Sequence, residues 1–229
     1  MPGIAENIGY VRERIARAAK EAGRDESGVV LVGAAKTAPA SAVREAAAAG
    51  LSVIGENRVQ EMLLKDSEGA YEGCGLHFIG RLQRNKVSKV VGRAELIQSV
   101  SSMELARSID ARAAALGIRQ DILLEINIAG EASKDGFPPE AVRGAVRETS
   151  ALSSVRVCGL MAIPPVFSGK EGRFFFEKMY KLFVDISTEK YDNVGMNFLS
   201  MGMSLDFEEA IRAGSNMVRV GTAIFGGRQ

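Results

Sequence analysis

The sequence VVLVGAAKTAPA, residues 29–40, begins the pattern from which the fold can be predicted. Its first residues are apolar and mostly β-branched, which is typical of a strand buried on both faces. Lys36 follows at the point where this strand should end. Because an ammonium group directly after a buried strand is costly to desolvate, its position indicates a function at the carboxyl end of the strand.

The same pattern of strand and helix repeats along the whole chain. Alternating strands and helices predict βαβ units and a parallel sheet. Eight such units in 229 residues predict one domain, residues 1–229, that folds as a closed (β/α)8 barrel of the TIM type. An open doubly wound sheet would need a GxGxxG turn after the first strand, and GAAKTAPA lacks one. The predicted strands are 29–36, 51–57, 75–80, 95–100, 121–128, 155–163, 197–202 and 216–221.

An additional helix is predicted before the first strand. Ile4, Ile8, Val11 and Ile15 recur at helical spacing, so they share one apolar face. The segment that contains them carries both acidic and basic residues and does not resemble a signal peptide.

Composition limits the possible classes of protein. The 29 basic and 28 acidic residues give a net charge of +1, which disfavours a broad surface for nucleic acid or for an anionic membrane. No apolar run approaches the roughly 20 residues of a membrane span. Cys74 and Cys158 form neither a CxxC pair nor a disulfide framework, so we expect a cytoplasmic protein. The single histidine, His77, excludes a His-rich metal site and is expected to be a satisfied side chain of the barrel.

Polar residues and glycines gather after several of the predicted strands. In a barrel of this kind the chemistry takes place at the carboxyl ends of the strands, so these side chains are expected to surround one pocket. They include Lys36 after the first strand, Asn57 after the second, Arg81–Lys86 after the third, Lys134 after the fifth, and residues 200–204 and 219–222 after the last two.

Lys36 is the candidate nucleophile. Ala34 and Ala35 precede it, so no carboxylate adjoins it in the sequence. Small apolar surroundings disfavour the ammonium form, and the neutral amine forms a Schiff base with an aldehyde. The alternative is a lysine that extends from the rim into solvent.

The loops after the seventh and eighth strands predict a phosphate site. Gly202 and Gly221 would let the backbone approach an anion, and Ser200 and Thr222 offer hydroxyl groups. Ordinary turns are the alternative interpretation, because glycine and serine are common in turns. A lysine that reacts with carbonyls, opposite a phosphate site, indicates pyridoxal phosphate or a phosphorylated sugar.

Arg219 discriminates between these ligands. It lies inside the apolar strand MVRVG, where an unpaired charge is expensive. One interpretation is a structural ion pair with Glu125 or Glu56. The other places its guanidinium against the pyridine nitrogen of a cofactor, which would keep that nitrogen unprotonated and make the ring a poor electron sink.

The motifs around these residues resemble those of the pyridoxal phosphate homeostasis proteins, which are single-barrel proteins similar to the N-terminal domain of alanine racemase. The resemblance runs nearly from end to end of the chain. The matching motifs are AAKT (34–37), IGENRVQE (54–61), LHFIGRLQRNK (76–86), INIAGEASKDGF (126–137), GLMAIPP (159–165) and the long block 199–226.

The resemblance implies that pyridoxal 5'-phosphate is bound to Lys36 as an aldimine. It implies phosphate contacts from Ser200 and from the Gly221–Thr222 backbone. Arg219 would face the pyridine nitrogen, and Asn57 would lie nearby on the rim.

Lys134 matches a lysine that the family carries after the fifth strand, which implies a secondary binding position or an exit for the cofactor. The chain departs from the family at two places. Ala35 and Ala38 stand where a serine and a second lysine are common. A role for a neighbouring hydroxyl group, or for transfer between lysines near the first strand, is therefore not expected here.

Two functions fit the resemblance, and a carrier is favoured. A carrier would hold the cofactor for vitamin B6 homeostasis and deliver it to apo-enzymes, as a monomer and without substrate turnover. An amino-acid racemase would need a second acid or base opposite Lys36, and no tyrosine lies at a strand end. A Schiff-base aldolase acting on a sugar phosphate would leave Arg219 unexplained. The tyrosines are Tyr10, Tyr71, Tyr180 and Tyr191.

Overall fold

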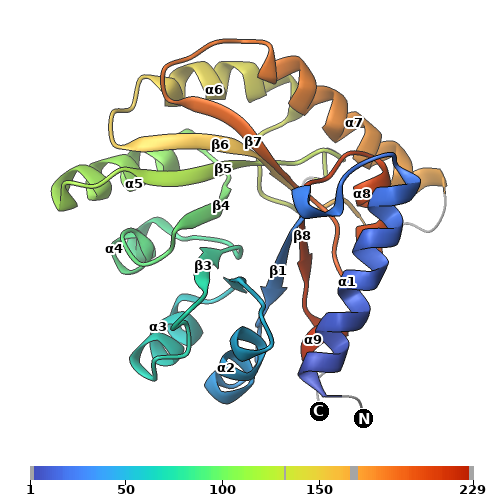
Figure 1. Ribbon diagram of the computed structural model, residues 1–229. Helices are drawn as coiled ribbons and strands as arrows, with labels where there is room; N and C mark the ends of the chain where they lie inside the picture. The colour runs from blue at the N-terminus through green and yellow to red at the C-terminus, as the bar shows by residue number, and fades with distance from the viewer. Residues whose placement is uncertain (1–2, 132, 166–169, 227–229) are drawn as a thin grey trace.

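Eight parallel strands close into a barrel in the order β1 to β8, as the prediction required (Figure 1). This computed structural model describes residues 3–131, 133–165 and 170–226. In each strand the carboxyl end points to the same mouth of the barrel, which therefore collects the loops that follow the strands. The strands are β1 (Val30–Ala34), β2 (Val53–Glu56), β3 (Gly75–Phe78), β4 (Leu96–Val100), β5 (Gln120–Ile126), β6 (Val155–Ala162), β7 (Val194–Ser200) and β8 (Met217–Val220).

The helices lie outside the barrel (Figure 1). None of those in the described ranges has the length and apolar character that crossing a membrane requires. They are α1 (Ile4–Glu21), α2 (Ala40–Ala48), α3 (Val59–Ser67), α4 (Val87–Val90), α5 (Met103–Leu116), α6 (Val142–Ser150), α7 (Lys170–Ser187), α8 (Phe207–Arg212) and α9 (Thr222–Phe225), with short 3-10 turns at Glu26–Gly28, Arg84–Lys86 and Pro139–Ala141.

The predicted additional helix is α1, and it packs beside the last two helices (Figure 1). Ile8, Val11 and Ile15 are buried on one face, as their spacing predicts. The side-chain amide of Asn7 donates a hydrogen bond of 2.9 Å to the carbonyl oxygen of Ile224. The first helix thus supports the short helix that follows β8.

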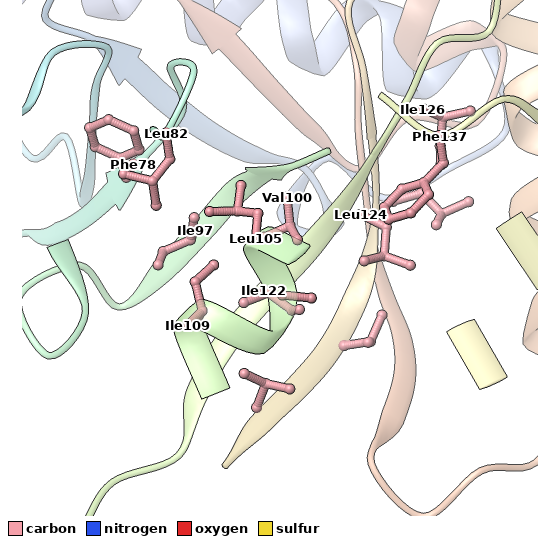
Figure 2. Packing of buried hydrophobic residues seen from close by; sticks show 14 of the residues in the cluster. Phe78, Leu82, Ile97, Val100, Leu105, Ile109, Ile122, Leu124, Ile126 and Phe137 are labelled. Carbon is pink, nitrogen blue, oxygen red and sulfur yellow. The ribbon is translucent and has the colours of Figure 1, made fainter. Parts of the chain in front are cut away.

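The core has one layer inside the barrel and another between the barrel and its helices. Figure 2 shows the second layer, where β3, β4 and β5 pack against α5. Phe78, Ile97, Leu105, Ile109 and Ile122 meet there, and each is 2% exposed or less. The interior layer is filled by Val32, Leu96, Leu123, Cys158, Met161 and Met217.

Glycines allow neighbouring strands to approach closely at two places. Gly159 has φ +146°, and a Cβ there would lie 1.9 Å from the carbonyl oxygen of Phe198. A Cβ on Gly80 would lie 2.1 Å from the carbonyl oxygen of Asn57. The second close approach lies just beyond the ends of β2 and β3, at the mouth of the barrel and beside the site described below.

Candidate functional site

A cavity of about 510 Å³ opens at the carboxyl ends of β1 and β8 and is called here the larger cavity. Lys36 follows β1 directly and lines it. The side chain is exposed, so the prediction that small apolar neighbours enclose this lysine is wrong. The other predicted residues in its wall are Asn57, Arg219, Gly221 and Thr222, and they are joined by Ser204.

Arg219 reaches the wall of the larger cavity from inside the barrel. Its side chain is held by two hydrogen bonds, from Nη1 to Ser200 Oγ at 2.5 Å and from Nη2 to the carbonyl oxygen of Ala162 at 2.9 Å. Burial lowers the pKa of Arg219 to about 10, while the charge of Glu125 acts in the opposite direction. At neutral pH the guanidinium therefore remains a cation.

The predicted ion pair of Arg219 with Glu125 or Glu56 is not formed in the part of the chain that the structure describes. Glu125 influences Arg219 through its charge alone, without a contact short enough to count as a salt bridge. Glu56 is fully buried on another side of β2 and binds Lys65 at 2.7 Å.

Ser200 does not lie on the rim, and that part of the prediction is wrong. It is fully buried beneath Arg219, at the end of β7. Its hydroxyl group donates to Gln98 Oε1 at 2.7 Å, and Gln98 Nε2 lies 2.9 Å from His77 Nδ1. Side chains from four strands thus form one chain of hydrogen bonds across the barrel interior. This series of hydrogen bonds supports the Arg219 guanidinium from the barrel interior.

His77 is a satisfied histidine of the barrel, as expected. It is 7% exposed and bonded to Gln98. Burial lowers the pKa of His77 to about 4, so the ring is neutral at physiological pH.

Ser204 lines the cavity, as expected for the segment 200–204, but the sequence assigned the phosphate contact to Ser200 and gave Ser204 no role. Its hydroxyl oxygen accepts hydrogen bonds from the backbone N–H groups of Gly221, at 3.2 Å, and Ala223, at 3.5 Å. It thereby ties the loop after β7 to the start of α9. The available signal was the second serine of SMGMS, four residues beyond Ser200.

Gly202 does not face the cavity, contrary to its predicted role beside an anion. It has φ +94°, and a Cβ there would lie 2.6 Å from Ala210 Cβ and 2.9 Å from Phe207 Cα. The glycine therefore allows α8 to pack against the loop.

A smaller cavity of about 300 Å³ adjoins the larger one, and Asn57, Ile79 and Ile163 line both. Lys134 lies in its wall, where Nζ is 3.0 Å from Glu131 Oε2. Of the basic segment Arg81–Lys86, only Arg81 lines this cavity, and its Nε is 2.8 Å from Asp135 Oδ2.

Glu125 lines the smaller cavity and is a titratable group with a shifted pKa. Burial raises the pKa of its carboxyl group to about 7, and repulsion by Asp135 adds to this shift. Arg219 and Arg81 act in the opposite direction. The carboxyl group is thus divided between its neutral and ionised forms near physiological pH.

The raised pKa of Glu125 predicts a pH-dependent stability. A carboxyl group whose pKa is higher in the folded state stabilises the fold at low pH, and this contribution is lost as the pH rises from about 4.5 to about 7. Glu125→Gln should remove it. We expect the variant to be more stable than the unaltered protein at pH 8 by ~3 kcal/mol, and nearly equal at pH 4.5.

Urea denaturation at pH 4.5, 6 and 8 measures this difference. Glu131→Gln is the matched control, because Glu131 forms an ion pair with Lys134 in the loop beside the same cavity. The control should keep the pH dependence of the unaltered protein. A constant difference between Glu125→Gln and the unaltered protein at all three pH values would contradict the prediction.

Comparison with known proteins places these residues in a family. The family model named "Alanine racemase, N-terminal domain" matches residues 7–229. The chain is 44% identical over 225 residues to the pyridoxal phosphate homeostasis protein of Aquifex aeolicus (strain VF5), and the match covers 98% of each chain. The chain belongs to the pyridoxal phosphate homeostasis family.

Solved structures agree with this membership in the family. PipY of Synechococcus elongatus PCC7942, solved with PLP bound, is 32% identical, with a TM-score of 0.84 over 97% of this chain and 100% of that one. The alanine racemase of Clostridium difficile 630 is 18% identical and shows the fold alone. Its TM-score is 0.71, over 95% of this chain but only 56% of the racemase.

Proposed function

We propose that this protein binds pyridoxal 5'-phosphate in the larger cavity and serves vitamin B6 homeostasis as a carrier. Lys36 would hold the cofactor as a Schiff base, and the cofactor would pass to apo-enzymes without turnover of a substrate. The main support for the proposal is that Lys36, Arg219 and Ser204 all line one cavity. The names of the relatives and the PLP bound to PipY support it.

The residues of the larger cavity fit the three parts of this cofactor. Lys36 supplies the amine. The cofactor supplies the aldehyde, whose carbonyl carbon is the electrophile. The Gly221–Thr222 backbone and Ser204 line the same cavity, where N–H and hydroxyl groups suit a phosphate. Arg219 reaches the wall from inside the barrel. Because Ser200 lies beneath Arg219, we assign the hydroxyl contact to Ser204 instead.

Arg219 supports the holding role. A guanidinium that stays charged at neutral pH would leave the ring nitrogen of the cofactor unprotonated, so the ring would withdraw few electrons. Ser200 and the carbonyl oxygen of Ala162 fix the guanidinium in place. Such a site favours retention of the cofactor over chemistry at a carbanion.

The racemase alternative lacks a second acid or base of the expected kind. No tyrosine lines either cavity in the described ranges. The hydroxyl group of Tyr71 instead donates to Glu56 Oε1 at 3.0 Å. A two-base exchange of the α-proton needs one group on each face of the ring. We infer a carrier, working as a cytoplasmic monomer, with apo-enzymes that use pyridoxal phosphate as its partners.

The test is an absorbance spectrum with pyridoxal phosphate, before and after borohydride reduction, followed by peptide mapping. We expect a Schiff-base band that borohydride removes, and a reduced adduct on Lys36. The loaded protein should reactivate an apo-enzyme and leave L-alanine unracemised. An adduct on another lysine would overturn the site, and rapid racemisation would overturn the carrier role.

A further inference from the structure

Lys36 lies on a tight turn with an unusual backbone. The N–H of Ala38 donates to the carbonyl oxygen of Ala35 at 3.0 Å, which closes a four-residue turn with Lys36 and Thr37 at its centre. Thr37 has φ +63° and is the only non-glycine residue with a positive φ in the described ranges. A positive φ at the third position is the mark of a type II turn, where glycine is the usual residue. The turn that presents Lys36 is therefore strained.

A buried cation holds this turn in place from behind. Lys65 is on α3, and its Nζ donates to the carbonyl oxygen of Ala35 at 2.7 Å. The same nitrogen donates to Glu56 Oε1, also at 2.7 Å. The Ala35 carbonyl oxygen thus accepts from both Lys65 and Ala38, which uses both of its lone pairs.

Lys65 is in turn fixed by its own neighbours. Lys65 is 5% exposed and Glu56 is fully buried. The hydroxyl group of Tyr71 donates to Glu56 Oε1 at 3.0 Å. Glu56 Oε2 is buried with no hydrogen-bond partner among the described residues. Burial raises the pKa of Glu56, and its contacts with Lys65 and Tyr71 lower it.

Stability alone does not account for this arrangement. A buried ion pair usually contributes no more to stability than well-packed apolar side chains of similar volume, because desolvating both charges is costly. An oxygen left without a partner adds to that cost. Strained backbone persists only where the surrounding structure over-determines it, and such places concentrate at functional sites.

We propose that Lys65, held by Glu56 and Tyr71, is a positioning residue that fixes the strained turn and thereby aims the amine of Lys36 into the larger cavity. The proposal rests on the proposed function for the part played by Lys36. It assigns Lys65 no contact with the cofactor. The role is transmitted through one backbone carbonyl group, that of Ala35.

A double-mutant cycle with Lys65→Met and Thr37→Gly tests the proposal. Methionine keeps the length of the side chain and removes the donor, whereas glycine removes the strain at Thr37. We expect Lys65→Met to slow Schiff-base formation by Lys36 about tenfold or more, because the amine is misplaced. In the Thr37→Gly background the same change should cost less than about threefold, since a relaxed turn no longer needs the clamp.

A second readout makes the test independent of the cofactor. An amine-reactive acylating reagent, applied to the cofactor-free protein and followed by peptide mass spectrometry, reports the reactivity of Lys36 alone. Lys65→Met should slow this labelling, and Lys65→Arg, which keeps the cation, should restore the rate. Lys178→Met is the matched control, because Lys178 Nζ also donates to a backbone carbonyl oxygen, that of Ile128, at 3.5 Å.

Equal labelling and Schiff-base rates in folded Lys65→Met and the unaltered protein would overturn the proposal. So would an equal loss in both Thr37 backgrounds, because it would show that Lys65 does not act through the strained turn. If Lys65→Met does not fold, Tyr71→Phe decides in its place: slower labelling supports the proposal, and unchanged labelling overturns it. If the unaltered protein shows no Schiff-base band, the proposed function fails, while labelling still tests the role of Lys65.

Discussion

Replacing Gly80 by alanine is expected to lower the free energy of unfolding by about 3 kcal/mol or more, because the added methyl group would overlap the backbone of the adjacent strand. The new Cβ would lie 2.1 Å from the carbonyl oxygen of Asn57 and 2.6 Å from its Cα. Neither segment can easily move away. The N–H of Ile79 donates to the carbonyl oxygen of Glu56 at 2.9 Å, and Ser99 Oγ donates to the carbonyl oxygen of Gly80 at 2.5 Å.

Denaturation by guanidinium chloride measures this loss. Gly144→Ala is the matched control, since a Cβ on Gly144 would meet no atom within 4 Å and the residue lies inside α6. The control should be more stable than the unaltered protein by about 0.5–1 kcal/mol, because alanine favours a helix over glycine. Unfolding of Gly80→Ala at the same denaturant concentration as the unaltered protein would contradict the close approach of β2 and β3.

Lys36→Ala should abolish the covalent attachment of pyridoxal phosphate while leaving the fold intact. The side chain is exposed, so the free energy of unfolding should change by less than about 0.5 kcal/mol. The phosphate and ring contacts would remain, and we expect the affinity to fall by a factor of about ten or more, equivalent to about 1.4 kcal/mol.

Equilibrium dialysis and borohydride trapping measure the two effects of Lys36→Ala separately. Lys134→Ala serves as the control, because Lys134 lines the adjoining smaller cavity and should not be required for the adduct. A reduced adduct of unchanged yield in Lys36→Ala would show that another amine forms the bond.

The barrel could be predicted because its signal is periodic and spread over the whole chain. Every strand segment proposed from apolar runs corresponds to a strand of the structure, from β1 through β8. The position of the site followed from the same pattern, since parallel strands bring all their carboxyl ends to one mouth. Lys36, Asn57 and Arg219 lie where this rule predicts.

The details that escaped prediction depend on where a single side chain points. Ser200 and Ser204 both belong to SMGMS. Because side chains alternate between the two faces of a strand, a shift of one residue in the end of the strand changes which side chain faces inward. Ser200 is the last residue of β7 and faces Arg219, so only Ser204 reaches the cavity.

The strained turn and its clamp also left no signal in the sequence. Threonine is not a residue that indicates a positive φ, so nothing at Thr37 predicts the turn. Lys65 lies nine residues beyond Glu56 on a short helix, where a lysine ordinarily reaches solvent. Only the packing of α3 against β2, and the hydrogen bond from Lys65 to the carbonyl oxygen of Ala35, reveal that its ammonium group is buried.

The pairing of the first strand with the last has a consequence for when the protein can first receive its ligand. Val32 is in register with Arg219, so the cavity wall that carries Lys36 is completed only when β8 has paired with β1. A nascent chain contains Lys36 long before Arg219, Gly221 and Thr222 exist to line the cavity beside it. We therefore expect chains stalled before β8 to be unable to retain pyridoxal phosphate.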